Sequence, residues 1–362
     1  MRHERTVESM NRKIPFEQNE LRAVEMIPGM FGRAPTPLRN TPVSPKENYA
    51  ALYYDKAPYW IPLPVENAMF STQLYGSRLS RGVPGTGTTD AFGIEWEYVP
   101  TAGGSMVRPG APFMADANEW KDKIKFPNID EWDWAAELEN VTLNPRLSIQ
   151  TSLVNGYWFE RLVSFMDFGP AVMALIDEDQ KDAVKSLFEA MTEFAMKVVD
   201  KFIEYWPEMD GFNVHDDWAA QKAPFFSKQT GYEMFVPYMR MLTDHIHSKG
   251  RYATLHSCGH GAMNVECFID GGFDRWDPQT MNDTYKLYDE FGDKIIIAVV
   301  PEPFDPETTS EAEQRERARA FVDRFTQPGK PCCIGSYGNP ALTPAFSDEL
   351  YEYSRKKYAG LL

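Results

Sequence analysis

The strongest chemical signal in the sequence is the pair His256 and Cys258. Residues 252–258 predict a strand, and alternate residues of a strand point to the same side, so the imidazole and the sulfur should lie next to each other. Zinc prefers mixed nitrogen and sulfur ligands, and a catalytic zinc needs three protein ligands and an open position. The pair therefore predicts half of a zinc site. The alternative is that Cys258 is a small apolar residue of a buried strand.

The third ligand should come from the end of another strand. Cys332 and Cys333 lie in the last predicted strand, 331–336, where one of the two must face inward, and Cys333 is closer to the carboxyl end. Cys267 is the weaker candidate, because it falls in the helix after the first pair and is expected to face the core. Packing of Cys332 and Cys333 within the strand remains the alternative, and the fourth ligand is open. The predicted metal ligands are His256, Cys258 and Cys333.

A second polar cluster, 213–218, also ends a predicted strand and contains His215, Asp216 and Asp217. Carboxylates are costly to bury without a partner, so this cluster suggests a function. We predict His215 and Asp217 as catalytic residues that act as general acid or base, orient a metal-bound histidine or bind a substrate hydroxyl. The alternative is a solvated loop in which an aspartate caps a helix.

Three further residues are predicted to bind substrate. Tyr157 and Trp158 precede a helix that should begin near Glu160, and they could line an aromatic pocket. Gln279 follows the strand predicted over 273–278 and should lie at the same end of the sheet. Packing of a helix on the sheet explains the aromatic pair equally well, and an ordinary polar loop explains Gln279.

Strands and helices alternate through the second half of the chain, which predicts a parallel sheet with right-handed crossovers. At least five such steps favour a closed (β/α)₈ TIM barrel, in which function lies on the loops after the strands. The predicted strands are 211–218, 252–258, 273–278, 295–301 and 331–336. The helices are predicted by apolar periodicity over 184–202 and 238–246, by a capping box at Ser310 and Glu313, and by the segment from about Ser347.

The first half of the chain is harder to interpret. Residues 1–46 are rich in proline and charged residues and predict an extended N-terminal arm, which could reach a second subunit in a homodimer. Prolines 35, 37, 42 and 45 argue against a helix there. Residues 47–362 predict one barrel domain that carries the catalytic site. Glycines between 82 and 110 predict long loops, and Gly85-Thr86-Gly87 lacks the third glycine of a dinucleotide-binding loop.

Charge and composition exclude several classes of partner. The formal charge is −16, which disfavours nucleic acids and anionic membranes. No stretch approaches the roughly 20 apolar residues of a membrane helix, and the charged N-terminus is no secretory signal. Four cysteines in 362 residues do not form a disulfide scaffold, so we expect a cytoplasmic protein.

The order and spacing of four motifs over roughly residues 150–345 resemble the uroporphyrinogen decarboxylase superfamily. Within it, the His-x-Cys motif followed far downstream by a cysteine resembles the zinc-dependent corrinoid methyltransferases. The motifs are His215-Asp216-Asp217-Trp218, Ser227 to Pro237, His256-Ser257-Cys258-Gly259 and Trp276-Asp277-Pro278-Gln279.

The resemblance implies a barrel, a zinc ion and transfer of a methyl group to or from a cobalamin carried by a separate corrinoid protein. Gln279 stands where the branch that methylates coenzyme M has a glutamate, which favours the branch that demethylates substrates, including aryl methyl ethers. The alternatives are a metal-free decarboxylase and a non-catalytic scaffold. The decarboxylase is disfavoured because its arginine-rich N-terminal signature is missing.

Overall fold

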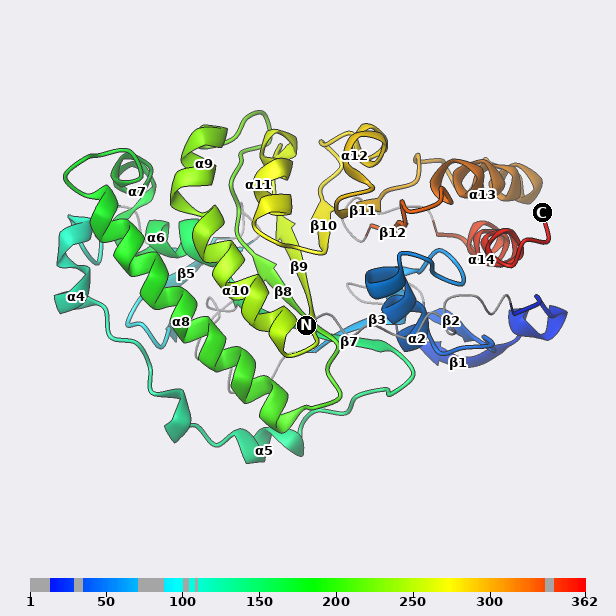
Figure 1. Cartoon of the computed structure of the whole chain (residues 1–362), viewed down its shortest axis with the longest axis horizontal. Coiled ribbons are helices and arrows are strands. Elements are labelled where there is room, and N and C mark those ends of the chain that lie inside the picture. The colour runs from blue at the N-terminus through cyan, green and yellow to red at the C-terminus, as the bar shows by residue number, and fades with distance from the viewer. Residues whose placement is uncertain (1–13, 29–34, 71–87, 100–103, 108–109, 336–341) are drawn as a thin grey trace. The chain divides into compact units, whose positions relative to one another are not determined.

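The chain has a mixed α/β fold in a computed structural model that describes residues 14–28, 35–70, 88–99, 104–107, 110–335 and 342–362 (Figure 1). It divides into two compact units. The first comprises Met1–Ala68, Asn144–Ile149 and Asp274–Leu362, and the second comprises Met69–Leu143 and Gln150–Phe273.

The centre of the second unit is formed by three parallel strands, β7 (Ser148–Asn155), β8 (Gly211–His215) and β9 (Tyr252–Ser257). In the register of β8 and β9, Gly211 lies opposite Tyr252 and His215 lies opposite His256. The strands predicted over 211–218 and 252–258 are therefore confirmed, although β8 ends three residues early. The register brings the two histidines to the same level at the carboxyl ends of neighbouring strands.

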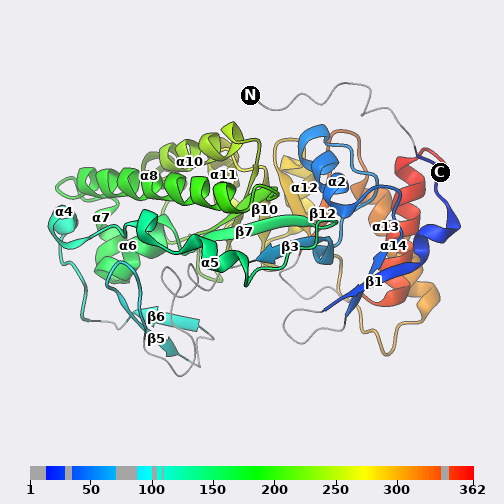
Figure 2. The same cartoon turned by 90° about the horizontal axis from the view of Figure 1, so that it is seen from below.

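Helices cover these strands, and the longest is α8 (Lys181–Tyr205), which lies beside α10 (Val236–Ser248) in Figures 1 and 2. Every residue of the predicted apolar face of α8 is buried, because the helical repeat places them all against the sheet and the neighbouring helices. These residues are Val184, Leu187, Phe188, Met191, Phe194, Val198, Val199 and Phe202.

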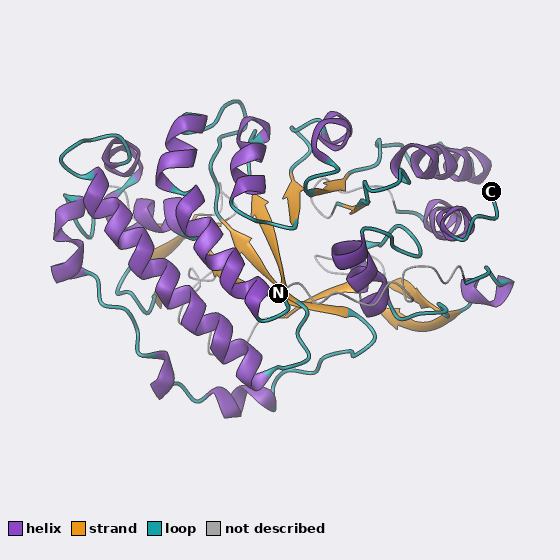
Figure 3. Cartoon of the chain, in the orientation of Figure 1, coloured by secondary structure: helices purple, strands orange, loops and turns teal. Residues whose placement is uncertain are grey.

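The other helices of this unit are short, and Figure 3 draws all helices in purple. The α-helices are α4 (Trp120–Lys123), α5 (Trp134–Leu138), α6 (Trp158–Met166), α7 (Phe168–Ala174), α9 (Lys228–Met234) and α11 (Val265–Asp270). Single 3₁₀ turns are η5 (Ala117–Glu119), η6 (Ile129–Glu131) and η7 (Ala262–Asn264).

An antiparallel three-stranded sheet occupies part of the region for which we predicted long loops. Its strands are β4 (Thr88–Thr89), β5 (Glu95–Val99) and β6 (Gly104–Val107). The prediction was wrong for these residues, because glycines at turns between short strands give the same local signal as glycines in a loop.

The first unit holds the C-terminal strands, in which β10 pairs in parallel with β11 and β11 with β12. The strands predicted over 273–278, 295–301 and 331–336 are confirmed as shorter strands, although residue 336 lies outside the described residues. Their bounds are β10 (Arg275–Pro278), β11 (Ile296–Val299) and β12 (Cys333–Ile334). The helices between and after them are α12 (Thr284–Phe291), α13 (Glu311–Phe325) and α14 (Pro344–Tyr358).

Strands β7 to β12 follow one another in the sheet in chain order, as they do in a β/α barrel. The full order is β12-β11-β10-β9-β8-β7-β3, with β3 at Asn67–Phe70. The described residues thus place seven strands in this sheet, and a closed barrel of eight strands stays a prediction.

The predicted arm contains more regular structure than its composition suggested. Strands β1 (Ala23–Ile27) and β2 (Thr36–Arg39) form an antiparallel pair, preceded by the 3₁₀ turn η1 (Gln18–Leu21). We expected no helix near Pro45, but Pro45 is the first residue of α2 (Pro45–Ala50), where its missing N–H costs no hydrogen bond.

The helix α2 continues into a π-helical turn, η3 (Ala51–Asp55), and the 3₁₀ turn η4 (Pro64–Glu66) precedes β3. The first unit therefore includes residues beyond the boundary that we predicted at residue 46.

Among the described residues, every helix is too short or too polar to cross a lipid bilayer.

Candidate metal centre

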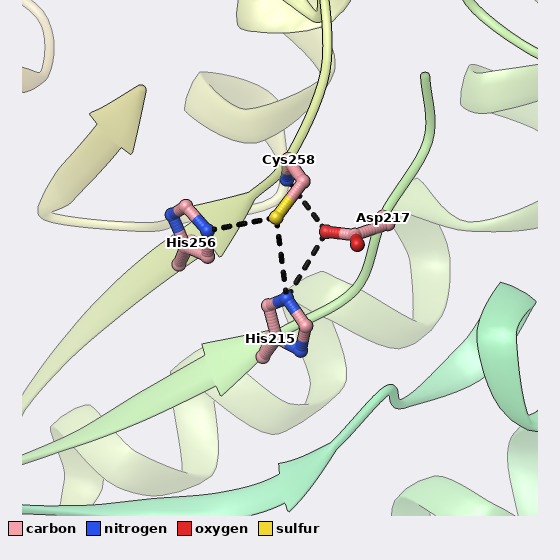
Figure 4. A group of neighbouring side chains, drawn as sticks. All are labelled: His215, Asp217, His256 and Cys258. Atoms are coloured by element: carbon pink, nitrogen blue, oxygen red, sulfur yellow. Dashed lines mark hydrogen bonds and ion pairs between the residues drawn. The ribbon is translucent and has the colours of Figure 1, made fainter. Parts of the chain in front are cut away.

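The carboxyl ends of β8 and β9 bring together His215, Asp217, His256 and Cys258 (Figure 4). One ligand atom from each residue lies within 4.8 Å of the ligand atoms of the others. His256 is the penultimate residue of β9, and Cys258 is the first residue after that strand. His215 ends β8, and Asp217 lies two residues further on. Two pairs with the same spacing thus face each other on neighbouring strands.

Cys258 is the centre of the group. Its Sγ lies 3.2 Å from His256 Nε2 and 4.0 Å from His215 Nε2. The prediction that His256 and Cys258 lie on the same side is confirmed. His256 is buried, whereas Cys258 is half-buried. The two imidazole rings are nearly parallel, with centroids 5.2 Å apart.

The Asp217 carboxylate contacts both the His215 imidazole and the backbone of Cys258. Its Oδ1 lies 3.0 Å from His215 Nε2 and accepts the backbone N–H of Cys258 at 2.6 Å. Burial opposes ionisation of Asp217, but His215 and the Cys258 N–H outweigh it and lower the pKa to about 2. Asp217 is therefore a carboxylate at neutral pH.

The loops after the two strands are joined by further contacts. The backbone N–H of His260 donates to the carbonyl of Ala220 at 2.8 Å, and the N–H of Trp218 donates to Ser257 Oγ at 3.2 Å. At Gly259 the two loops are so close that an added Cβ would lie 2.1 Å from the Ala219 oxygen. The φ of Gly259 is +81°. Glycine tolerates both conditions because it has no Cβ.

The donor set fits a zinc ion. Zinc bonds of about 2.0–2.3 Å in a tetrahedron separate ligand atoms by roughly 3.3–3.8 Å, which is within the range spanned by this group. Two imidazoles, a thiol and a carboxylate are all groups that zinc accepts. The arrangement therefore suits a divalent metal that polarises a bound oxygen.

Neither a protein-family model nor a curated protein matches the sequence. Solved structures do match. A methyltransferase from Methanosarcina mazei shares 14% identity over 87% of this chain and 86% of that chain, with a TM-score of 0.47. A D-psicose 3-epimerase shares 12% identity over 68% and 86% of the two chains, with a TM-score of 0.30.

A third structure, the IOLI protein with a zinc atom bound, shares 11% identity over 64% of this chain and 81% of that chain, with a TM-score of 0.29. At these identities, function has to be argued from the site itself.

Cys333 belongs to the first unit, whereas the four-residue group belongs to the second unit. Its thiol is buried and hydrogen-bonded to Arg275, and burial raises its pKa to about 12 although Arg275 lowers it. Cys332 is also buried, and its Sγ lies 3.6 Å from the carbonyl oxygen of Phe325. Cys333 as a metal ligand stays a prediction. Cys267 is buried in α11, as expected.

The predicted substrate-binding residues lie in two places. Tyr157 and Trp158 are buried, and their polar atoms bind α8: the Tyr157 hydroxyl donates to the Met191 carbonyl, and Trp158 Nε1 donates to the Thr192 hydroxyl. This favours the packing interpretation of the pair. Gln279 is half-buried directly after β10, in the first unit. Contact of any of these residues with substrate stays a prediction.

Sequence reasoning missed two features of the site. It assigned His215 to proton transfer and did not place it among the metal ligands, although His215-x-Asp217 has the same spacing as His256-x-Cys258. It used Glu160 only to mark the start of a helix. The Glu160 Oε2 atom lies 3.5 Å from His215 Nδ1 and accepts the backbone N–H of Asp217 at 3.0 Å.

Proposed function

We propose that this chain is a zinc-dependent methyltransferase that moves a methyl group from a small methylated substrate to the cobalt of a corrinoid held by a separate protein. The observation that carries the proposal is the convergence of two histidines, a cysteine and an aspartate within 4.8 Å at the ends of β8 and β9. The resemblance of the same motifs to corrinoid methyltransferases supplies the reaction class. Among possible methyl donors, we favour aryl methyl ethers.

The residues that would hold zinc are His256 and Cys258, with His215 and Asp217 beside them. When bound, zinc supplies a Lewis acid that stabilises the oxygen released from an ether. A catalytic site needs three protein ligands, whereas this group offers four, so one residue is left to act on the substrate. Asp217, whose side chain is 25% exposed, is more accessible than His215, whose side chain is 15% exposed.

Asp217 and His215 have different tasks in this proposal. The low pKa of Asp217 keeps it ionised, so it can orient or accept a proton but has none to donate at neutral pH. His215 Nε2 lies 3.0 Å from that carboxylate and 4.0 Å from Cys258 Sγ, so His215 would be the third residue that holds zinc. Asp217 is then the residue left to act on the substrate.

The test combines a substrate screen with metal analysis. Purified protein is mixed with a reduced corrinoid protein and a panel of methoxylated aromatics, methylamines, methanol and methyl thiols, and cobalt methylation is followed by absorbance. We expect turnover of a methoxylated aromatic and about one zinc per chain. His256→Ala and Cys258→Ser should lose zinc and activity together.

Cys267→Ser is the matched control, because Cys267 is buried in α11 outside the four-residue group and should leave zinc content unchanged. Full turnover by a zinc-free variant would refute the proposal.

A further inference from the structure

Glu160 lies behind the metal-ligand group, in the first turn of α6. Its side chain is 14% exposed. One carboxylate oxygen, Oε2, contacts both His215 and Asp217: it accepts the Asp217 N–H at 3.0 Å and lies 3.5 Å from His215 Nδ1. The other ring nitrogen of His215, Nε2, faces Asp217 and Cys258. Glu160 thus approaches His215 at the nitrogen that the ligand group does not use.

The position of Glu160 is fixed by the loop that it supports. Asp216 is fully buried, and its two oxygens accept the backbone N–H groups of Phe159 and Glu160, each at 3.0 Å. Trp218 Nε1 donates to the same carboxylate at 2.9 Å. The loop after β8 therefore caps α6, and α6 returns the Glu160 carboxylate to that loop. This reciprocal contact leaves Glu160 little freedom to turn away from His215.

Two carboxyl groups, those of Glu160 and Asp216, lie beside the candidate ligand pair in a partly buried region. A bound cation would offset a negative charge there, because a metal ion is the largest local charge in its site.

We infer that Glu160 is a positioning residue that holds His215 with its proton on Nδ1 and thereby presents Nε2 to the metal. The inference rests on the metal centre of the proposed function. A carboxylate behind a ligating histidine fixes the tautomer and the ring orientation and raises the basicity of the ligating nitrogen. Loss of such a partner weakens metal binding by about 10- to 100-fold.

The experiment measures zinc affinity by competition with a chelator, together with the visible spectrum of the Co²⁺-substituted protein. Glu160→Gln keeps the size of the side chain and an acceptor for the Asp217 N–H but removes the charge that faces His215. We expect affinity to fall by about 10-fold in Glu160→Gln and about 100-fold in Glu160→Ala. The Co²⁺ spectrum should shift in both variants.

Glu189→Gln, an exposed position on α8, controls for the loss of one negative charge and should bind zinc like the wild type. Thermal unfolding identifies any variant that is not folded at the temperature of the assay. Unchanged zinc affinity and an unchanged Co²⁺ spectrum in folded Glu160→Gln and Glu160→Ala would overturn the inference. Zinc binding that depends on Glu160 without any methyl transfer would instead contradict the proposed reaction and leave this inference standing.

Discussion

The carboxylate of Asp217 accepts the backbone N–H of Cys258 at 2.6 Å, so a side chain from the loop after β8 fixes the backbone of the loop after β9. Both residues also belong to the candidate metal centre. The geometry of the centre therefore depends on the contact between these loops as well as on the ligands themselves.

The closest approach between the loops gives the first prediction. Gly259→Ala should lower both stability and zinc affinity, because the new Cβ would lie 2.1 Å from the Ala219 oxygen and the backbone has a φ of +81°. Gly329→Ala is the matched control, since Gly329 has a φ of +73° with no atom within 4 Å of the added Cβ. The control should lose only the stability, roughly 1–2 kcal/mol, that a residue with a Cβ costs in the left-handed conformation. Urea unfolding of both variants measures the difference, and equal losses would show that the loop contact is unimportant.

The role of Cys333 gives the second prediction. Cys333→Ser should retain zinc, because the thiol is buried against Arg275 and lies outside the four-residue group. Zinc content by elemental analysis is the measurement, and Cys332→Ser on the same strand is the control. Loss of zinc in Cys333→Ser alone would instead establish Cys333 as the ligand that the sequence predicted.

The third prediction concerns the dependence of stability on pH in the first unit. Burial raises the pKa of Glu66 from 4.5 to about 7, even though Trp60 and the Leu63 N–H donate to the carboxylate. Since the folded state then binds the proton more tightly than the unfolded state, this group makes the free energy of unfolding fall as pH rises from about 4.5 to 7. The full effect is about 3 kcal/mol at 1.36 kcal/mol per pKa unit.

Glu66→Gln carries no charge at any pH and should lose this part of the pH dependence. Urea unfolding between pH 4.5 and 8 compares it with wild type and with Glu316→Gln, an exposed control on α13. A Glu66→Gln curve parallel to that of the wild type would rule out the raised pKa.

The fourth prediction concerns Asp167, which joins α6 to α7 with φ +67° and ψ 163°. This conformation is almost restricted to glycine and costs about 1–3 kcal/mol in other residues. Asp167→Gly should therefore be more stable than Asp167→Ala, although both lose the hydrogen bond that Asp167 Oδ2 accepts from the Gly110 N–H. Gly169 is the control, because it lies within α7 and an added Cβ there meets no atom within 4 Å. Gly169→Ala should therefore be more stable than the wild type, since alanine favours a helix more than glycine does. Thermal unfolding of the three variants decides, and a more stable Asp167→Ala would contradict the assigned backbone strain.

The sequence by itself determined the pairs that can do chemistry and the strands that carry them. Alternation along a strand is a local property, so His256 and Cys258 had to lie on one side wherever the strand was placed. The apolar repeat of α8 was determined in the same way, since 3.6 residues per turn leave one face for the core.

Only the tertiary structure decided which pairs meet. The register of β8 and β9 sets His215 opposite His256, and a shift of one residue would turn one pair to the other side. The capping of α6 by Asp216, and with it the place of Glu160 behind His215, joins residues 56 positions apart in the chain. Such contacts depend on how strands and helices pack, and no local pattern in the sequence encodes them.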